Sequence, residues 1–206
     1  MEKKAESTEQ KPNSAYPTDE RRNLGNDKRH LGENRDSLVA RLRSGDRAAA
    51  TELVDTYYEQ IYLYMRRLGH DRQTSEDLAQ ESFLRAWHHI GQLRDGKALN
   101  SWLYRIAGNV SRLYWRKHRH KEIPGVEDID MLRGDNREPN TVERYEQLEQ
   151  LESAVLRLPV KLRQSVVLHY MQQLTIAEAA DAAGVRPGTF KSRLNRALRA
   201  LRKQIK

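Results

Sequence analysis

Near its C-terminus, this 206-residue sequence concentrates residue types that read DNA bases. Arginine and lysine recognise guanine edges in the major groove, and asparagine recognises adenine. Such residues recur on one side of a helix that we expect from residue 187 to about residue 202: Lys191, Ser192, Arg193, Asn195, Arg196 and Arg199. This stretch predicts base recognition in duplex DNA.

A second stretch, residues 100–121, combines cations with aromatic rings and contains no acidic residue. Cations can follow the phosphates of a single strand while rings stack on its unpaired bases. Five residues at three- or four-residue steps would share one helix face: Trp102, Arg105, Asn109, Arg112 and Arg116. For Trp102, core packing and base stacking both remain open. Trp115 lies in a run of cations and is expected to be exposed.

A helix-turn-helix would position the C-terminal residues. Thr175 and Glu178 have the spacing of a capping box, which predicts a short helix to about residue 183. Gly184 suits the left-handed turn, and Pro187 suits the first turn of the next helix. The inward face would carry Phe190, Leu194, Ala197 and Leu201. A basic helical hairpin without a DNA partner is the alternative.

Three helices would position residues 100–121. Asp46 can cap the first, which ends at Gly69, and Thr74 with Asp77 resembles a capping box for the second. A loop over residues 92–97 separates the second from the third. Helical spacing predicts inward faces that consist of Val54, Tyr57, Ile61, Met65 and Leu68, then Ala79, Phe83, Ala86 and Ile90, then Leu103, Ile106, Val110 and Leu113.

Charge divides the chain into two basic blocks and an acidic connector. The net charge is 0 over residues 1–36, +6 over 37–121, −7 over 122–152 and +9 over 153–206, within a total of +8. This pattern favours a polyanion that is contacted twice, with a solvated charged surface as the alternative.

Composition narrows the class of protein. With 37% hydrophobic and 32% charged residues, two modest helical cores are expected in place of one large core. The chain has no cysteine and only scattered histidines, so no metal, cofactor or small-molecule substrate is expected. Short apolar runs and a polar start predict a cytoplasmic protein without membrane insertion or signal peptide.

The chain is expected to be all-α, with two small helical domains joined by an acidic flexible linker. Residues 1–36 would be a disordered extension, 37–121 the first domain, 122–140 the linker and 141–206 the second domain. In the second domain, one helix would run from about residue 141 to Pro159 and another from Val160 to Met171. The first of these would carry Leu148, Leu151, Val155 and Leu158 on one face.

Paired motifs resemble those of extracytoplasmic-function (ECF, group IV) sigma factors. Residues 75–87 (SEDLAQESFLRAW) and 101–109 (SWLYRIAGN) resemble their region two. The Leu158-Pro159 pair and residues 184–194 (GVRPGTFKSRL) resemble their region four. The resemblance covers about residues 38–206. It implies a non-enzymatic subunit that directs core RNA polymerase to promoters of a stress or envelope-type regulon.

The resemblance also assigns site residues. Polymerase docking would use Asp77, Gln80, Glu81, Phe83, Arg85 and Trp87. Recognition and melting of the minus-ten element would use Gln92, Leu93, Arg94, Asp95, Lys97, Trp102, Arg105, Asn109, Arg112 and Arg116. Recognition of the minus-thirty-five element would use Arg186, Thr189, Lys191, Ser192, Asn195, Arg196 and Arg199.

The resemblance also implies a regulatory partner and a role for the linker. An anti-sigma factor is usual in the family and would hold the protein at the inner membrane face. The linker would thread through the polymerase cleft. Alternatively, its acidic residues would only increase the solubility of the protein. Many relatives have an aromatic residue where this chain has Leu93. A serine cap is common in relatives at the position of Arg186. A DNA-binding repressor or activator is the first competing function, and a metal-dependent nucleic-acid-processing enzyme is the second.

Overall fold

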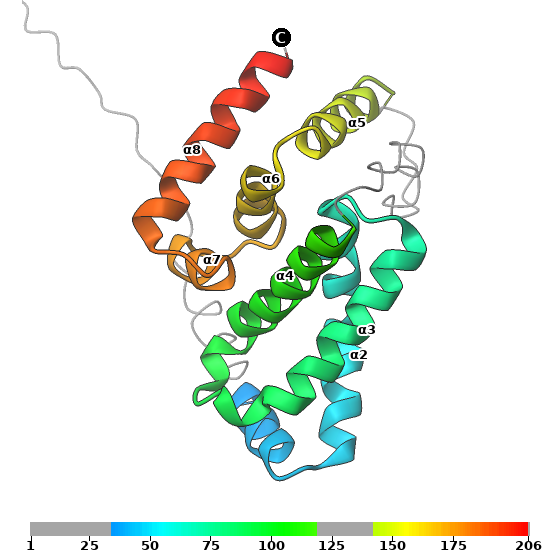
Figure 1. Cartoon of the computed structure of the whole chain (residues 1–206), viewed down its shortest axis with the longest axis vertical. Coiled ribbons are helices and arrows are strands. Elements are labelled where there is room, and N and C mark those ends of the chain that lie inside the picture. The colour runs from blue at the N-terminus through cyan, green and yellow to red at the C-terminus, as the bar shows by residue number, and fades with distance from the viewer. Residues whose placement is uncertain (1–33, 119–141, 206) are drawn as a thin grey trace, which may run out of the picture.

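The computed structural model describes residues 34–118 and 142–205, which form helices joined by short turns (Figure 1). This part of the chain contains no strand, and the all-α prediction is confirmed. The proposed linker at 122–140 and most of the proposed N-terminal extension lie outside the described residues.

The N-terminal unit contains a helix over residues 34–43, followed by α2 (Arg47–Arg67), α3 (Arg72–His89) and α4 (Leu99–Lys117). Two 3-10 turns, Ile90–Gln92 and Gly96–Ala98, connect α3 to α4. Asp46 caps α2 as predicted, because its carboxylate accepts a hydrogen bond from the Ala48 amide at 2.8 Å. The boundary at residue 36 is wrong, since the first helix already includes residues 34–36.

The predicted capping box at Thr74 and Asp77 is wrong. α3 begins at Arg72, and Asp71 is its N-cap residue. The Asp71 carboxylate accepts hydrogen bonds from the amide and the hydroxyl of Thr74, each at 2.8 Å. A carboxylate three residues upstream thus takes the capping role, and the Thr74 hydroxyl becomes its donor.

The C-terminal unit contains α5 (Val142–Leu156), α6 (Val160–Val166), a π-helical turn (Val167–Met171), α7 (Ile176–Ala182) and α8 (Pro187–Gln204). The helix predicted for residues 160–171 is present, although its second half is this π-helical turn. Reciprocal bonds between Thr175 and Glu178 confirm the capping box of α7. Gly184 has a φ of 65°, and Pro187 begins α8, so both turn predictions are confirmed.

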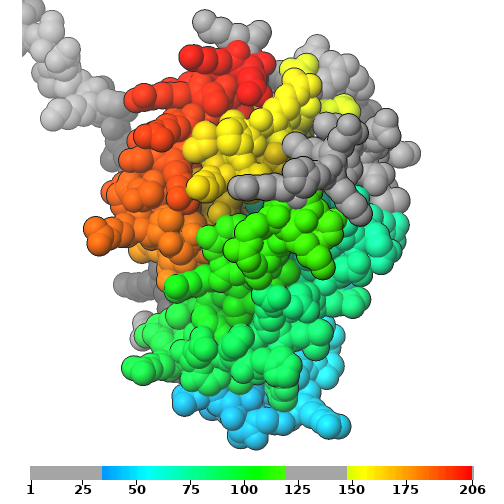
Figure 2. Space-filling model, in the orientation of Figure 1, coloured from blue at the N-terminus to red at the C-terminus, as the bar shows by residue number. Residues whose placement is uncertain are grey.

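The two units share one core. Their buried apolar residues form a continuous cluster that extends from the helix at residues 34–43 to α8, so the expectation of two separate cores is wrong. In the space-filling view, the surface of α4 (green) directly meets that of the C-terminal unit (Figure 2). The protein thus consists of two helical units packed against each other.

Three leucines that were predicted to face inward are exposed. Leu148 and Leu151 are 50% and 37% exposed, whereas Ala154 and Val155, in the last turns of α5, are buried. Leu113 is 38% exposed, because aromatic residues occupy the packed positions at the end of α4.

Candidate nucleic-acid interface

α8 presents its predicted DNA-reading residues to solvent. The four residues predicted to face inward are all buried, and Phe190 is completely so. The seven residues predicted to read the minus-thirty-five element are all exposed: Arg186, Thr189, Lys191, Ser192, Asn195, Arg196 and Arg199. Because α8 carries no acidic side chain, nothing on the helix itself opposes an approaching phosphate.

The turn between α7 and α8 fixes how these residues are presented. The amides of Gly184 and Val185 donate to the carbonyls of Asp181 and Ala180, each at 2.9 Å. Val185 packs against the core between α7 and α8. Arg186 is the N-cap residue of α8, but its side chain makes no capping bond. The turn therefore holds the start of α8 without using the Arg186 guanidinium.

α4 exposes the polar face that was predicted from its spacing. Arg105, Asn109, Arg112 and Arg116 are exposed, and Trp102 is half-buried. Arg112 donates one hydrogen bond to the Asn109 side chain and another, at 3.4 Å, to the carbonyl of Gly108. Asn109 and Arg112 are thus positioned together on one face.

Gly108 permits a close approach in the middle of α4. A Cβ atom at this position would lie 2.7 Å from Nε2 of Gln164 and 3.2 Å from the Tyr64 hydroxyl. Glycine lowers helix stability by about 1 kcal/mol relative to alanine, so a packing reason of this kind is expected. That expectation is confirmed.

The end of α4 is anchored by a buried histidine. His70 Nε2 lies 2.7 Å from the Ser111 hydroxyl, and its ring stacks on Trp115 with centroids 4.8 Å apart. Burial lowers the pKa of His70 to about 4, so the imidazole is neutral near pH 7. The predicted exposure of Trp115 is wrong, because this stacking leaves the residue half-buried.

The loop at residues 92–97 is only partly available for DNA. Gln92, Arg94, Asp95 and Lys97 are exposed, whereas Leu93 is 3% exposed and packs in the core. Its assignment to the minus-ten interface is therefore wrong.

Two carboxylates shape this loop. Asp95 accepts a hydrogen bond from the Lys97 amide, and Asp36 accepts one from the Gly96 amide, both at 2.8 Å. Asp36 belongs to the helix at residues 34–43, so this helix holds the loop in place.

The start of the α4 face meets α7. Arg105 Nη1 lies 3.2 Å from one carboxylate oxygen of Asp181, and the Ser101 hydroxyl lies 3.3 Å from the other. Tyr104 donates a hydrogen bond of 2.6 Å to the side-chain oxygen of Gln172. One part of the predicted single-strand surface is thus already occupied by the C-terminal unit.

Family models match both units. Residues 53–121 match Sigma-70 region 2, and residues 148–201 match Sigma-70 region 4. The ECF RNA polymerase sigma factor SigW of Bacillus subtilis is 31% identical over 177 residues, which are 82% of this chain and 95% of SigW. This chain belongs to the ECF RNA polymerase sigma factors.

Two solved structures share the fold. CnrH, in complex with the cytosolic domain of CnrY, aligns with a TM-score of 0.60 and 22% identity over 81% of this chain and 94% of its own. RpoE of Bartonella quintana, in complex with the anti-sigma factor NepR, aligns with a TM-score of 0.58 and 21% identity. That alignment covers 75% of this sigma factor and 95% of RpoE.

α3 of this sigma factor carries the residues predicted to dock on polymerase. Asp77 and Gln80 are exposed, and Glu81 pairs with Arg85 at 2.6 Å near the surface. Phe83 is largely buried, and its predicted contact with polymerase stays a prediction.

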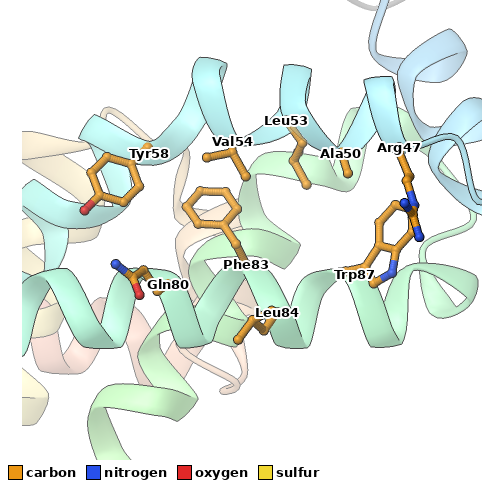
Figure 3. Close-up of a pocket in the computed structure, with 9 residues that line it drawn as sticks. All are labelled: Arg47, Ala50, Leu53, Val54, Tyr58, Gln80, Phe83, Leu84 and Trp87. Atoms are coloured by element: carbon orange, nitrogen blue, oxygen red, sulfur yellow. The ribbon is translucent and has the colours of Figure 1, made fainter.

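Phe83 lines an apolar groove between α2 and α3, of about 520 Å³. Figure 3 shows its ring pointing from α3 toward Val54 of α2, while Arg47 and Trp87 stand together at one end of the groove. Leu84 lies on the rim and is largely exposed.

Two kinds of feature are absent from the part of the chain that the structure describes. No group of three or more histidine, aspartate or glutamate side chains there could hold a metal ion. None of the helices in residues 34–118 and 142–205 is long and apolar enough to cross a membrane.

Proposed function

We propose that this sigma factor binds core RNA polymerase, recognises promoters through the minus-thirty-five and minus-ten elements and opens the DNA at the minus-ten element. The observation that carries the proposal is the pair of cationic helices, α4 and α8, on one chain, neither of which contains an acidic residue. Family membership supports the role, because ECF sigma factors direct transcription initiation.

The domains have separate tasks in this proposal. Residues 37–121 dock on polymerase and melt the minus-ten element, residues 141–206 read the minus-thirty-five element, and residues 122–140 connect them. Exposed residues of α8 and its N-cap make the duplex contacts. The single strand is held by half-buried Trp102 and by exposed residues of α4 and its preceding loop: Gln92, Arg94, Lys97, Arg105, Asn109, Arg112 and Arg116. Asp95 shapes that loop through its bond to the Lys97 amide.

Polymerase docks on the polar surface of α3 formed by Asp77, Gln80, Glu81 and Arg85, with Trp87 at its end. The protein acts by positioning polymerase and DNA, in the cytoplasm, and carries out no reaction of its own. An anti-sigma factor is its expected regulator. The complex of Bartonella quintana RpoE with the anti-sigma factor NepR supports this partner class.

The test is promoter binding by the purified protein with and without core RNA polymerase. Each unit alone offers a small DNA surface, so specific binding should require the polymerase, and addition of nucleotides should then yield a transcript from a linear promoter. Equally tight, sequence-specific binding without polymerase would instead identify a repressor or activator.

A further inference from the structure

The loop that the proposed function assigns to the minus-ten element is anchored at two points. Leu93 is buried at the first anchor, and its amide donates to the carbonyl of Ile90 at 3.0 Å. Gly96 is buried at the second anchor. Arg94 lies between the two anchors, Lys97 follows the second, and both cations are exposed. Because each cation adjoins an anchored residue, its direction depends on how the anchors are held.

The helix at residues 34–43 makes the anchor at Gly96. The Gly96 amide donates a hydrogen bond of 2.8 Å to Oδ1 of Asp36. A Cβ atom on Gly96 would lie 2.5 Å from that oxygen, 2.6 Å from the Asp36 backbone nitrogen and 2.7 Å from the Arg35 carbonyl carbon. Backbone atoms cannot turn away as the end of a side chain can. The loop therefore rests directly on this helix, which is blue in Figure 1.

The same helix is itself fixed to the rest of the N-terminal unit. Its buried apolar side chains belong to the shared core: Leu38, Val39 and Leu42. Arg41 pairs with the Glu52 carboxylate of α2 at 2.7 Å, but a partly exposed ion pair adds little stability, so apolar burial holds the helix. Residues 34–43 precede the segment that matches Sigma-70 region 2. An element outside that segment thus supports the loop.

A second carboxylate acts on the loop only locally. Asp95 accepts hydrogen bonds from the Lys97 amide at 2.8 Å, through its side chain, and from the Ala98 amide at 3.1 Å, through its carbonyl. These bonds fix the curvature of the turn that leads into α4. Asp36 differs, because it is 60 positions away from Gly96. Its bond therefore sets where the turn lies relative to the rest of the unit.

We propose that Asp36 is a positioning residue for minus-ten recognition, whose carboxylate holds Gly96 and thereby directs Arg94 and Lys97 toward the unpaired bases. This inference rests on the proposed function of the loop. Groups that bind a ligand lose precision when a missing support lets them move by about 1 Å. Loss of the Asp36 acceptor therefore relaxes the choice between bases of the minus-ten element. Polymerase docking on α3 and duplex reading by α8 do not depend on it.

The test measures open-complex formation by the polymerase holoenzyme on a promoter that the wild type has selected from a randomised library, and on single-substitution variants of both elements. Asp36→Ala should lower the ratio of matched to mismatched minus-ten promoters by about fivefold, as expected for one lost hydrogen bond, and leave the minus-thirty-five ratio unchanged. Asp36→Asn keeps an oxygen that can accept from Gly96 and should retain most of the preference. Asp55→Ala removes an exposed carboxylate of α2 and should change neither ratio.

Gly96→Ala breaks the same contact from the side of the loop. Its Cβ atom would push the loop away from the helix at residues 34–43, so the minus-ten preference should fall at least as far as in Asp36→Ala. The double variant Asp36→Ala/Gly96→Ala should be no worse than Gly96→Ala alone, because both changes remove one contact. Additive losses would show that Asp36 acts elsewhere and would overturn the inference.

The variant Arg94→Ala/Lys97→Ala separates this inference from the proposed function. If it loses the minus-ten preference while Asp36→Ala keeps it, the loop reads the element without Asp36, and the inference alone is overturned. If Arg94→Ala/Lys97→Ala keeps the preference, the assignment of the loop to the minus-ten element fails, and the inference fails with it. Lower overall activity of Asp36→Ala with both ratios unchanged is the result of a purely structural role and also overturns the inference.

Discussion

α4 and α8 are similar in composition but differ in their surroundings. Both are long cationic helices without an acidic residue, and both are expected to contact DNA. α8 exposes all of its predicted reading residues and packs only through apolar ones. α4 is held at its start by Asp181 and at its end by buried His70.

Under the proposed function, this difference would let the two DNA elements be recognised under different conditions. A duplex-reading surface can be displayed permanently, because intact DNA is available to it at any time. A surface for unpaired bases is useful only once polymerase has engaged the promoter. The polar contacts around α4 join it to residues distant in the chain, whereas α8 packs through apolar side chains.

The largest expected effect concerns the acid stability of the α4 anchor. The pKa of His70 is about 4 in the folded protein, against 6.5 as its ordinary value. The unfolded chain therefore binds the proton first, so the contribution of His70 is complete above pH 6.5 and is lost as the pH falls toward 4. That loss amounts to about 3 kcal/mol. Urea unfolding of the wild type and His70→Gln at several pH values measures it.

Amide hydrogen exchange locates this effect. As the pH falls, the protection factors in α4 should decrease before those in α8, whose buried side chains are apolar. Parallel pH dependences for the wild type and His70→Gln would show that the buried imidazole does not control stability.

Removal of the strand-holding pair should have the next largest effect. Base flipping costs a few kcal/mol, which contacts to the open strand must offset. Asn109→Ala/Arg112→Ala should therefore lower open-complex formation by roughly 50-fold, while polymerase binding stays intact. Permanganate footprinting on a linear promoter measures unpaired thymines. A pre-melted template should restore transcription, and absence of that rescue would make α4 a docking or structural element.

Base reading by α8 should give a smaller, position-specific effect. Arg196→Ala and Lys191→Ala should each cost about 1–3 kcal/mol of promoter binding and relax the preference at one base pair. The effect is best measured with the polymerase holoenzyme on single-substitution variants of the minus-thirty-five element. Unchanged selectivity in both variants would place the recognition surface elsewhere on α8.

Arg199 should show the smallest effect, because it lies further along α8 and is assigned to a phosphate. Arg199→Ala should weaken binding to all sequences equally and reduce the slope of log affinity against log salt by about 0.9. A salt titration of binding to matched and mismatched promoters tests this. A change in base preference would show that Arg199 reads a base instead.

Local signals in the sequence predicted much of the fold. The cap at Asp46, the box at Thr175 and Glu178, and the turn at Gly184 each depend on a few neighbouring residues, and all are confirmed. Thr74 misled the prediction, because the sequence offers two acceptable caps and Asp71 takes the position.

Contacts between the units could not be predicted in this way. Arg105 and Asp181 are 76 positions apart, and Leu68 and Arg163 are 95 apart, so no spacing rule connects them. Asp181 could have drawn attention only as an isolated carboxylate in a basic block. His70 gave no signal, because its importance arises from the ring of Trp115 that packs on it.

Arg163, in α6, donates a hydrogen bond of 2.6 Å to the carbonyl of Leu68 at the end of α2, and its setting has a consequence for how the two units pack together. Its guanidinium also donates to the carbonyls of Leu156 and Leu158, both within its own unit. Ordering a free arginine side chain costs about 1.5–2 kcal/mol of rotamer entropy. Here that ordering is maintained by the carbonyls of Leu156 and Leu158 and does not depend on the hydrogen bond to Leu68. The Arg163 guanidinium is therefore preorganised within its own unit. Packing of the two units does not require a search for the conformation of this side chain.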